Sequence, residues 1–274
     1  MSLDSLNKQE KKVLKEILSP SKYYMRPIIR KINQWVASQQ NIKNAWVLVL
    51  NQLHDIIRNS QSGVEKLLEG RIQQKKIKSK SQAMKSIVGN AFSNSLIYVF
   101  LLNKVHGNVP RWIFITSQIS SIPNFKKSIN INIQNEVQKP DMDIVIYTLN
   151  DGFKQKREPE NYIILSLKTS LRERAAQTYK WKLLMEIALH SPELREKYSI
   201  FYQSSAVPIV CFATTNFYNE INNPQQRGML KFFDRSFIAK EIAFTQNSLI
   251  YPLSNLISFA IEKLSNPYVQ LSLF

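Results

Sequence analysis

Four short segments rich in β-branched and aromatic residues, all after Gly107, constrain the fold more than any other feature of this sequence. Each is typical of a β-strand, and they are Trp112–Thr116, Ile144–Thr148, Tyr162–Leu167 and Val207–Ala213. A loop over residues 150–161 begins Asn-Asp-Gly and predicts a hairpin between the second and third strands. Helical spacing of apolar residues predicts helices at Arg174–Leu189 and Leu253–Leu264. We therefore expect an α/β (α+β) fold, with a mixed central β-sheet flanked by helices.

The first third of the chain has a helical pattern instead. Apolar residues recur there at steps of three and four, namely Leu14, Leu18, Ile29, Ile32, Trp35, Val36, Val49, Leu53, Ile56 and Ile57. Pro20, Pro27 and the segment Asn59–Gly63 interrupt this pattern and predict turns. We therefore divide the chain into a basic helical N-terminal domain, residues 1–77, and a second domain, residues 78–274, that contains the sheet.

The net charge favours a polyanionic partner. The chain has 37 Lys and Arg against 20 Asp and Glu, a net charge of +17, and residues 1–80 hold 16 of these bases but only 6 of the acids. Nucleic acid is the first expectation and an anionic membrane surface the second, although solvated helix faces account for most of the lysines. The longest apolar run, near Leu96–Leu102, is too short to span a membrane, so we expect no membrane-spanning segment.

Cysteine and histidine are too few and too scattered for a zinc site. Cys211 is the only cysteine, which excludes an internal disulfide, and its apolar neighbours predict a buried strand residue that is not a nucleophile. His54, His106 and His190 lie far apart in the sequence. The first residues are charged and do not resemble a secretory signal, so we expect a cytoplasmic protein.

Two aspartates before the second strand and a lysine at the end of the third can form a catalytic group. Asp141 and Asp143 are two residues apart, which places both carboxylates on one face of a strand, where they can share a Mg²⁺ ion. A solvated turn after Pro140 explains the same residues, and the aspartates alone favour that interpretation. In a hairpin, Lys168 would lie beside them, where an ammonium can orient a metal-bound water and stabilise charge on a phosphate.

Three charged residues follow that lysine at the predicted start of a helix. An arginine can donate two hydrogen bonds to guanine and a glutamate can accept one from cytosine, so they suit a G and C rich site read in the major groove. An exposed helix start, with charges that pair with one another, gives the same pattern. The residues are Arg172, Glu173 and Arg174.

The run Lys168–Arg174 (KTSLRER), with Pro140 and Asp141 upstream and a predicted hairpin between, resembles the type II restriction endonucleases of the PD-(D/E)xK superfamily that recognise a CCGG or closely related core. In that family, a lysine, three residues and then Arg-Glu-Arg or a near variant form the recognition signature. Residues Lys80–Phe92 resemble the helix that precedes the sheet in the same enzymes. The similarity covers roughly residue 78 to the carboxyl terminus and does not extend to the residues before it.

This resemblance implies a restriction-endonuclease-like fold and a nuclease function. It implies that Asp141 or Asp143 forms the cleavage site with Lys168. It also implies Mg²⁺ as cofactor, a palindromic site in double-stranded DNA as substrate, and a homodimer or higher homo-oligomer. Contacts to the DNA bases would come from Arg172, Glu173 and Arg174.

The sequence departs from the family pattern at two places. Relatives usually have a glutamate 13 or 14 residues after the lysine, but Trp181 and Lys182 occupy these positions. Glu186, one helical turn beyond Lys182, is our candidate for the displaced catalytic and metal-binding residue, although an ordinary surface glutamate fits nearly as well. Relatives also commonly have an acid where this chain has Ser93, which predicts fewer metal ligands.

Two other functions fit the same residues. A non-catalytic nucleic-acid-binding protein would use the basic charge and the Arg-Glu-Arg helix without cutting. A repair or RNA-processing nuclease could share the sheet and its catalytic residues, because a fold does not determine a substrate.

Overall fold

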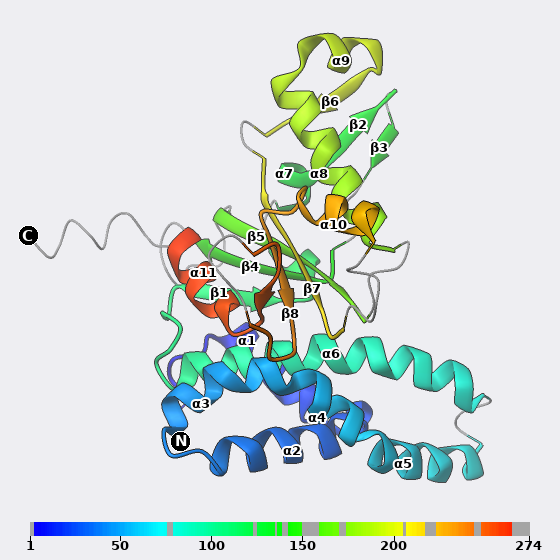
Figure 1. Ribbon diagram of the computed structural model, residues 1–274, viewed down its shortest axis with the longest axis vertical. Helices are drawn as coiled ribbons and strands as arrows, with labels where there is room; N and C mark the ends of the chain where they lie inside the picture. The colour runs from blue at the N-terminus through cyan, green and yellow to red at the C-terminus, as the bar shows by residue number, and fades with distance from the viewer. Residues whose placement is uncertain are drawn as a thin grey trace, which may run out of the picture.

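A six-stranded mixed sheet lies at the centre of the protein (Figure 1). The computed structural model describes residues 3–75, 79–122, 125–134, 136–138, 142–149, 159–169, 174–204, 207–216, 223–243 and 248–264. In spatial order the strands are β1 (Ile113–Thr116), β4 (Ile144–Leu149), β5 (Pro159–Lys168), β7 (Ile209–Thr214), β8 (Arg235–Ile238) and β9 (Tyr251–Pro252). The pairs β1–β4 and β4–β5 are antiparallel, whereas β5, β7, β8 and β9 run parallel.

The predicted α/β architecture is confirmed. The four predicted strands correspond to β1, β4, β5 and β7, and the predicted hairpin is the antiparallel pair β4–β5, in which Ile144 lies opposite Leu165. The predicted helices are α8 (Arg174–His190) and α11 (Asn255–Lys263). The sequence patterns did not indicate β8 and β9, which have four and two residues.

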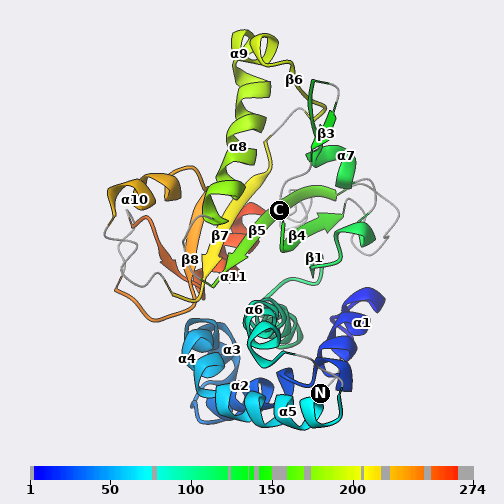
Figure 2. The same ribbon diagram turned by 90° about the vertical axis from the view of Figure 1, so that its right-hand side faces the viewer.

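Helices cover both faces of the sheet (Figure 2). Successive side chains of a strand point to opposite faces, and in β5 the side chains of Ile163 and Leu165 join one core cluster whereas Ile164 joins the other. The first cluster contains the N-terminal helices and α11, and the second contains α8. The sheet is therefore buried on both sides, which explains why its strands are continuous apolar runs.

Six helices precede the sheet and pack beneath it. They are α1 (Lys8–Ile17), α2 (Met25–Ala37), α3 (Ile42–Leu48), α4 (Leu53–Asn59), α5 (Gln61–Gln73) and α6 (Lys80–Val105). Two short 3₁₀ turns lie among them, η1 (Pro20–Lys22) and η2 (Val49–Gln52), and a third, η3 (Ile119–Ser121), follows β1. Asn7 caps α1 in a reciprocal capping box with Glu10, which satisfies two backbone N–H groups at the start of the helix.

One predicted turn was wrong, and another is shorter than predicted. Pro27 lies in the first turn of α2. The backbone N–H groups of a first turn have no partner within the helix, so a proline, which lacks this group, is tolerated there. The predicted turn over Asn59–Gly63 is confined to Ser60 between α4 and α5, because Gly63 is already helical. A Cβ atom on Gly63 would lie 3.2 Å from Cβ of Pro27, so glycine allows α5 to approach α2 closely.

Helix α6 is the central helix of the N-terminal half. It is long and apolar enough to meet the length and composition of a membrane-spanning helix, and 67% of its most apolar stretch is buried inside the protein. It contacts the five preceding helices, α1 to α5, and the strands β1 and β5. The buried Asn103 donates hydrogen bonds to the carbonyls of Trp46, at 2.6 Å, and Val99, at 2.9 Å.

A fully buried ion pair joins α1, α6 and β1. Lys104 Nζ lies 2.8 and 3.0 Å from the two carboxylate oxygens of Glu10 and donates to the Ile113 carbonyl at 2.7 Å. The same ammonium lies 4.4 Å from the centre of the Phe114 ring. Burial raises the pKa of Glu10 and lowers that of Lys104, and their mutual attraction opposes both shifts.

A smaller sheet lies beyond the central one, at the far end of α8. Its strands, in the order β3-β2-β6, are β3 (Glu136–Gln138), β2 (Ile131–Ile133) and β6 (Ile200–Tyr202), and the flanking helices are α7 (Phe125–Ile129) and α9 (Pro192–Lys197). Met185 and Ala188 of α8 belong to the same core cluster as Ile131 and Ile200. Helix α10 (Pro224–Leu230) packs against the side of α8 nearer the central sheet. The sequence analysis did not anticipate this second sheet.

Candidate active site

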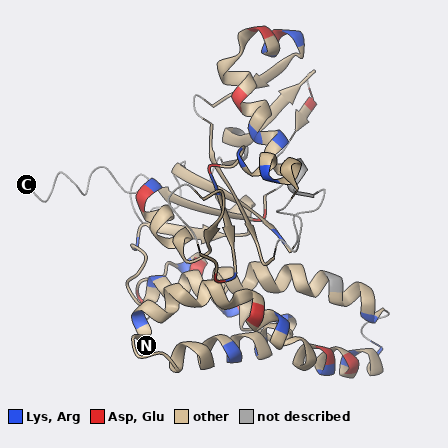
Figure 3. Cartoon of the chain, in the orientation of Figure 1, with Lys and Arg blue, Asp and Glu red and all other residues tan. Residues whose placement is uncertain are grey.

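A lysine and an aspartate meet at one edge of the central sheet. Lys168 is the last residue of β5, and Asp143 directly precedes β4, whose start lies beside the end of β5 because the two strands are antiparallel. Lys168 Nζ lies 3.1 Å from Asp143 Oδ2. The side chains are 11% and 32% exposed, so a substrate can reach the aspartate. Figure 3 shows that the charged residues of the protein lie mainly on its helices, with few on the strands.

The backbone holds this aspartate in place. Asp143 Oδ2 also accepts a hydrogen bond from the backbone N–H of Leu167, at 2.7 Å. Two donors from neighbouring residues of β5 therefore converge on one carboxylate oxygen. This arrangement fixes the carboxylate beside the ammonium.

A buried hydroxyl pair positions α8 next to the same strand end. Ser166 and Lys168 lie on one face of β5, and Ser166 Oγ is 3.0 Å from Thr178 Oγ1 of α8. Neither hydroxyl was predicted as part of the site, although a serine within the apolar run YIILSL was a visible signal. Their contact places the start of α8, residue Arg174, near the end of β5.

The described part of the structure does not include the side chains of the predicted recognition residues or of one predicted metal ligand. Asp141, Arg172 and Glu173 lie outside the described residues, as does the side chain of Arg174. Of the predicted catalytic residues, the structure thus brings together Asp143 and Lys168.

Glu186 lies in a different part of the protein from this pair. Its carboxylate is 3.7 Å from Lys182 Nζ, which also contacts Asp234 at 2.8 Å. Asp234 in turn accepts a hydrogen bond from the N–H of Val210, the strand partner of Ile164. Ile164 precedes Lys168 by four residues of strand, so Ile164 and its partner Val210 lie about 13 Å from Lys168 along the sheet. Glu186 is eight residues beyond Thr178, about 12 Å further along α8 and away from Lys168.

The arrangement suits a metal ion that is held mainly by substrate and water. Among the described residues, no group of three or more His, Cys, Asp or Glu side chains is close enough to hold a metal. Mg²⁺ usually retains several waters and binds through one or two carboxylates together with substrate phosphates. The exposed carboxylate of Asp143 fits that requirement.

The single cysteine has no part in the site. Cys211 is fully buried in β7, as predicted, and this burial raises the pKa of its thiol. A thiol in this environment stays protonated at neutral pH and is not a nucleophile.

Comparison with known proteins identifies the family. Residues 121–260, just over half of the chain, match the family described as BsaWI restriction endonuclease type 2. Two solved structures share a distant likeness: metal-depleted Ecl18kI in complex with uncleaved, modified DNA (11% identity, TM-score 0.45, 92% of this chain and 83% of that chain) and metal-depleted Ecl18kI in complex with uncleaved DNA (13%, 0.42, 96% and 84%). No curated protein sequence matches. The matched segment contains Asp143 and Lys168, and the chain belongs to the BsaWI family of restriction endonucleases, which makes it a type II site-specific DNA endonuclease.

Proposed function

We propose that the protein cuts both strands of a palindromic DNA site with a CCGG core, in a reaction that requires Mg²⁺. The observation that carries this proposal is the contact between Lys168 and Asp143 at an accessible sheet edge, within the segment that matches the family. The net charge of +17 supplies attraction to the DNA backbone.

The two side chains have complementary tasks in this reaction. The Asp143 carboxylate, together with Asp141, would hold the metal ion, which when bound would polarise the phosphoryl oxygen and acidify a water molecule. The Lys168 ammonium orients the attacking water and stabilises the negative charge that develops on the phosphate. Glu186 is assigned no contact with this centre, because it lies about 12 Å beyond Thr178 along α8.

Two copies of the chain would act together. A palindromic site presents two equivalent phosphodiesters, and one copy supplies one Lys168. A homodimer with two-fold symmetry places one such lysine at each strand. The oligomeric state in the presence of a specific DNA duplex, measured by light scattering, tests this part of the proposal.

Cleavage of a sequenced plasmid tests the proposed function directly. Purified protein with Mg²⁺ should give discrete fragments with ends that map to sites containing CCGG, and EDTA should stop the reaction. Fragments without a common sequence would contradict site-specific cutting, and ends at another fixed sequence would contradict the CCGG assignment alone.

Glu173→Ala is expected to relax the sequence preference. A glutamate that accepts from cytosine contributes about 1–3 kcal/mol of discrimination, so the ratio of cleavage rates between CCGG and singly substituted cores should fall about 5- to 150-fold. Single-turnover rates on short duplexes measure this ratio. Glu193→Ala, the same change at the exposed start of α9, is the matched control and should leave the ratio unchanged. An unaltered ratio for Glu173→Ala would remove this residue from base recognition.

A further inference from the structure

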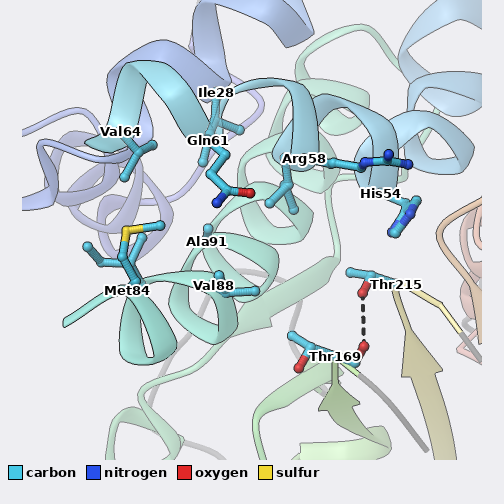
Figure 4. Close-up of a pocket in the computed structure, with 12 residues that line it drawn as sticks. Ile28, His54, Arg58, Gln61, Val64, Met84, Val88, Ala91, Thr169 and Thr215 are labelled. Atoms are coloured by element: carbon cyan, nitrogen blue, oxygen red, sulfur yellow. Dashed lines mark hydrogen bonds between the residues drawn. The ribbon is translucent and has the colours of Figure 1, made fainter. Parts of the chain in front are cut away.

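A cavity of about 250 Å³ lies between the N-terminal helices and the ends of two sheet strands (Figure 4). His54 and Arg58 of α4 and Gln61 of α5 line it from one side. Thr169 and Thr215, which directly follow β5 and β7, line it from the other. The cavity therefore lies between the segment that matches the family and helices outside that segment.

The cavity lies next to the proposed catalytic lysine. Thr169 follows Lys168, and Thr215 follows Thr214, the strand partner of Lys168. Thr215 Oγ1 donates a hydrogen bond to the Thr169 carbonyl at 3.2 Å, which ties the two strand ends together. Consecutive Cα atoms are about 3.8 Å apart and nucleotides of one DNA strand rise by about 3.4 Å. A phosphate one or two nucleotides from the one at Lys168 is thus within reach of the cavity.

The polar side of the cavity is basic. In Figure 4 the His54 ring lies between the Arg58 side chain and Thr215. No ion pair to Arg58 occurs within the described part of the chain, and this residue is exposed. Burial lowers the pKa of His54, and the positive charges of Lys240 and Arg58 lower it further against the opposing effect of Asp55. An anion placed here would meet the Arg58 guanidinium, which forms no ion pair among the described residues, beside an imidazole that can donate a hydrogen bond.

The remaining walls are apolar, and the cavity is small. Val64, Met84 and Ala91 form the part that faces away from the basic residues. The volume is below the roughly 300–1,000 Å³ of pockets that enclose a complete small-molecule ligand. A cavity of this size and polarity suits one unit of a longer molecule, with a charged group at the mouth and a less polar group inside.

We propose that Arg58 and His54 bind a backbone phosphate of the cleaved DNA strand, with the adjoining deoxyribose against the apolar wall. This inference rests on the proposed function and gives the N-terminal helices a part in it. They hold the substrate strand on the side of the sheet opposite α8, close to where that strand is cut. Because a phosphate contact carries no sequence information, the residues contribute affinity and position but no discrimination between sites.

Arg58→Ala is expected to weaken DNA binding about ten-fold, because a charge-assisted hydrogen bond contributes about 1.5 kcal/mol or more. The affinity loss should be equal for duplexes with and without CCGG, and the slope of log K against log salt concentration should decrease by about one. Titrations in EDTA, which prevents cutting, measure both quantities. Arg58→Lys should recover most of the slope, since it keeps the charge. Arg30→Ala, an exposed arginine of α2 that does not line the cavity, is the matched control.

A second measurement detects the contact without a loss of affinity. The imidazole signals of the three histidines can be followed by NMR during pH titration, and His54→Gln assigns the signal of His54. DNA binding should raise the pKa of His54, because a phosphate stabilises the imidazolium form. Inorganic phosphate at the same anion concentration should raise it less, since it lacks the remaining DNA contacts.

The outcomes separate this inference from the proposed function. If the wild type cuts at CCGG sites but Arg58→Ala keeps both its affinity and its salt slope, the cavity is a packing defect and the inference is wrong. If DNA leaves the pKa of His54 unchanged, the inference is equally wrong. If the wild type fails to cut while Arg58→Ala still lowers the slope, the proposed cleavage fails and the phosphate contact stands.

Discussion

Lys168→Ala should reduce the rate of DNA cleavage by about 10²–10⁴-fold, the range that positioned proton-transfer groups and preorganised charges contribute to catalysis. Specific binding should remain close to that of the wild type, because the affinity comes from many phosphate and base contacts elsewhere. The fold should also be retained, since Asp143 keeps its hydrogen bond from the Leu167 N–H and is partly exposed to water.

Single-turnover cleavage of a plasmid and a gel-shift titration in EDTA measure the two effects of this substitution. Lys180→Ala is the matched control, because Lys180 is exposed on the neighbouring helix α8 and has no hydrogen bond or ion pair among the described residues of the site. Cleavage by Lys168→Ala at the wild-type rate would show that the chemistry takes place elsewhere. A parallel loss of binding and cleavage would instead make Lys168 a DNA contact.

Lys104→Met is expected to lower the free energy of unfolding by about 3–5 kcal/mol, the typical cost of removing one partner from a buried ion pair. Glu10 is 2% exposed and would be left with a carboxylate but no counter-charge in the apolar interior. The double variant Glu10→Leu and Lys104→Met should recover most of this loss, because two apolar residues have no charge to desolvate.

Urea denaturation of the wild type, both single variants and the double variant gives the coupling between these residues. The same substitution in the exposed pair, Lys80→Met, should leave the unfolding midpoint unchanged, because Lys80 and Glu69 lie in water. Equal effects of Lys104→Met and Lys80→Met would mean that the buried pair does not hold α1 against α6 and β1.

Local patterns were sufficient for the central sheet and for part of the site. The β-branched runs of β1, β4, β5 and β7 identified these strands, and the proximity of Asp143 and Lys168 followed from the hairpin between them. Of the three functions considered from the sequence, the family match supports the restriction endonuclease over the non-catalytic binding protein and the repair or RNA-processing nuclease.

Long-range contacts explain what the patterns left out. The surroundings of Glu186 depend on the contact between Lys182 and Asp234, which are 52 positions apart, and no periodicity signals such a pair. Pro27 was misjudged because a proline in a first helical turn is indistinguishable from one in a loop until the helix start is known. The cavity beside Thr169 forms only when α4 packs next to it, although α4 precedes Thr169 by more than a hundred residues in the sequence.

The first core cluster contains residues from almost the whole length of the chain, from Leu6 to Leu264, and includes Leu167 next to Lys168. A ribosome adds about 5–20 residues per second, so synthesis from Leu6 to Leu264 takes on the order of 10–50 s. During this time the nascent chain lacks part of the support behind its cleavage site. A nuclease built in this way is expected to become active only after Leu264 has been synthesised, and chains terminated before this residue are expected to be harmless to the chromosome of the cell that makes them.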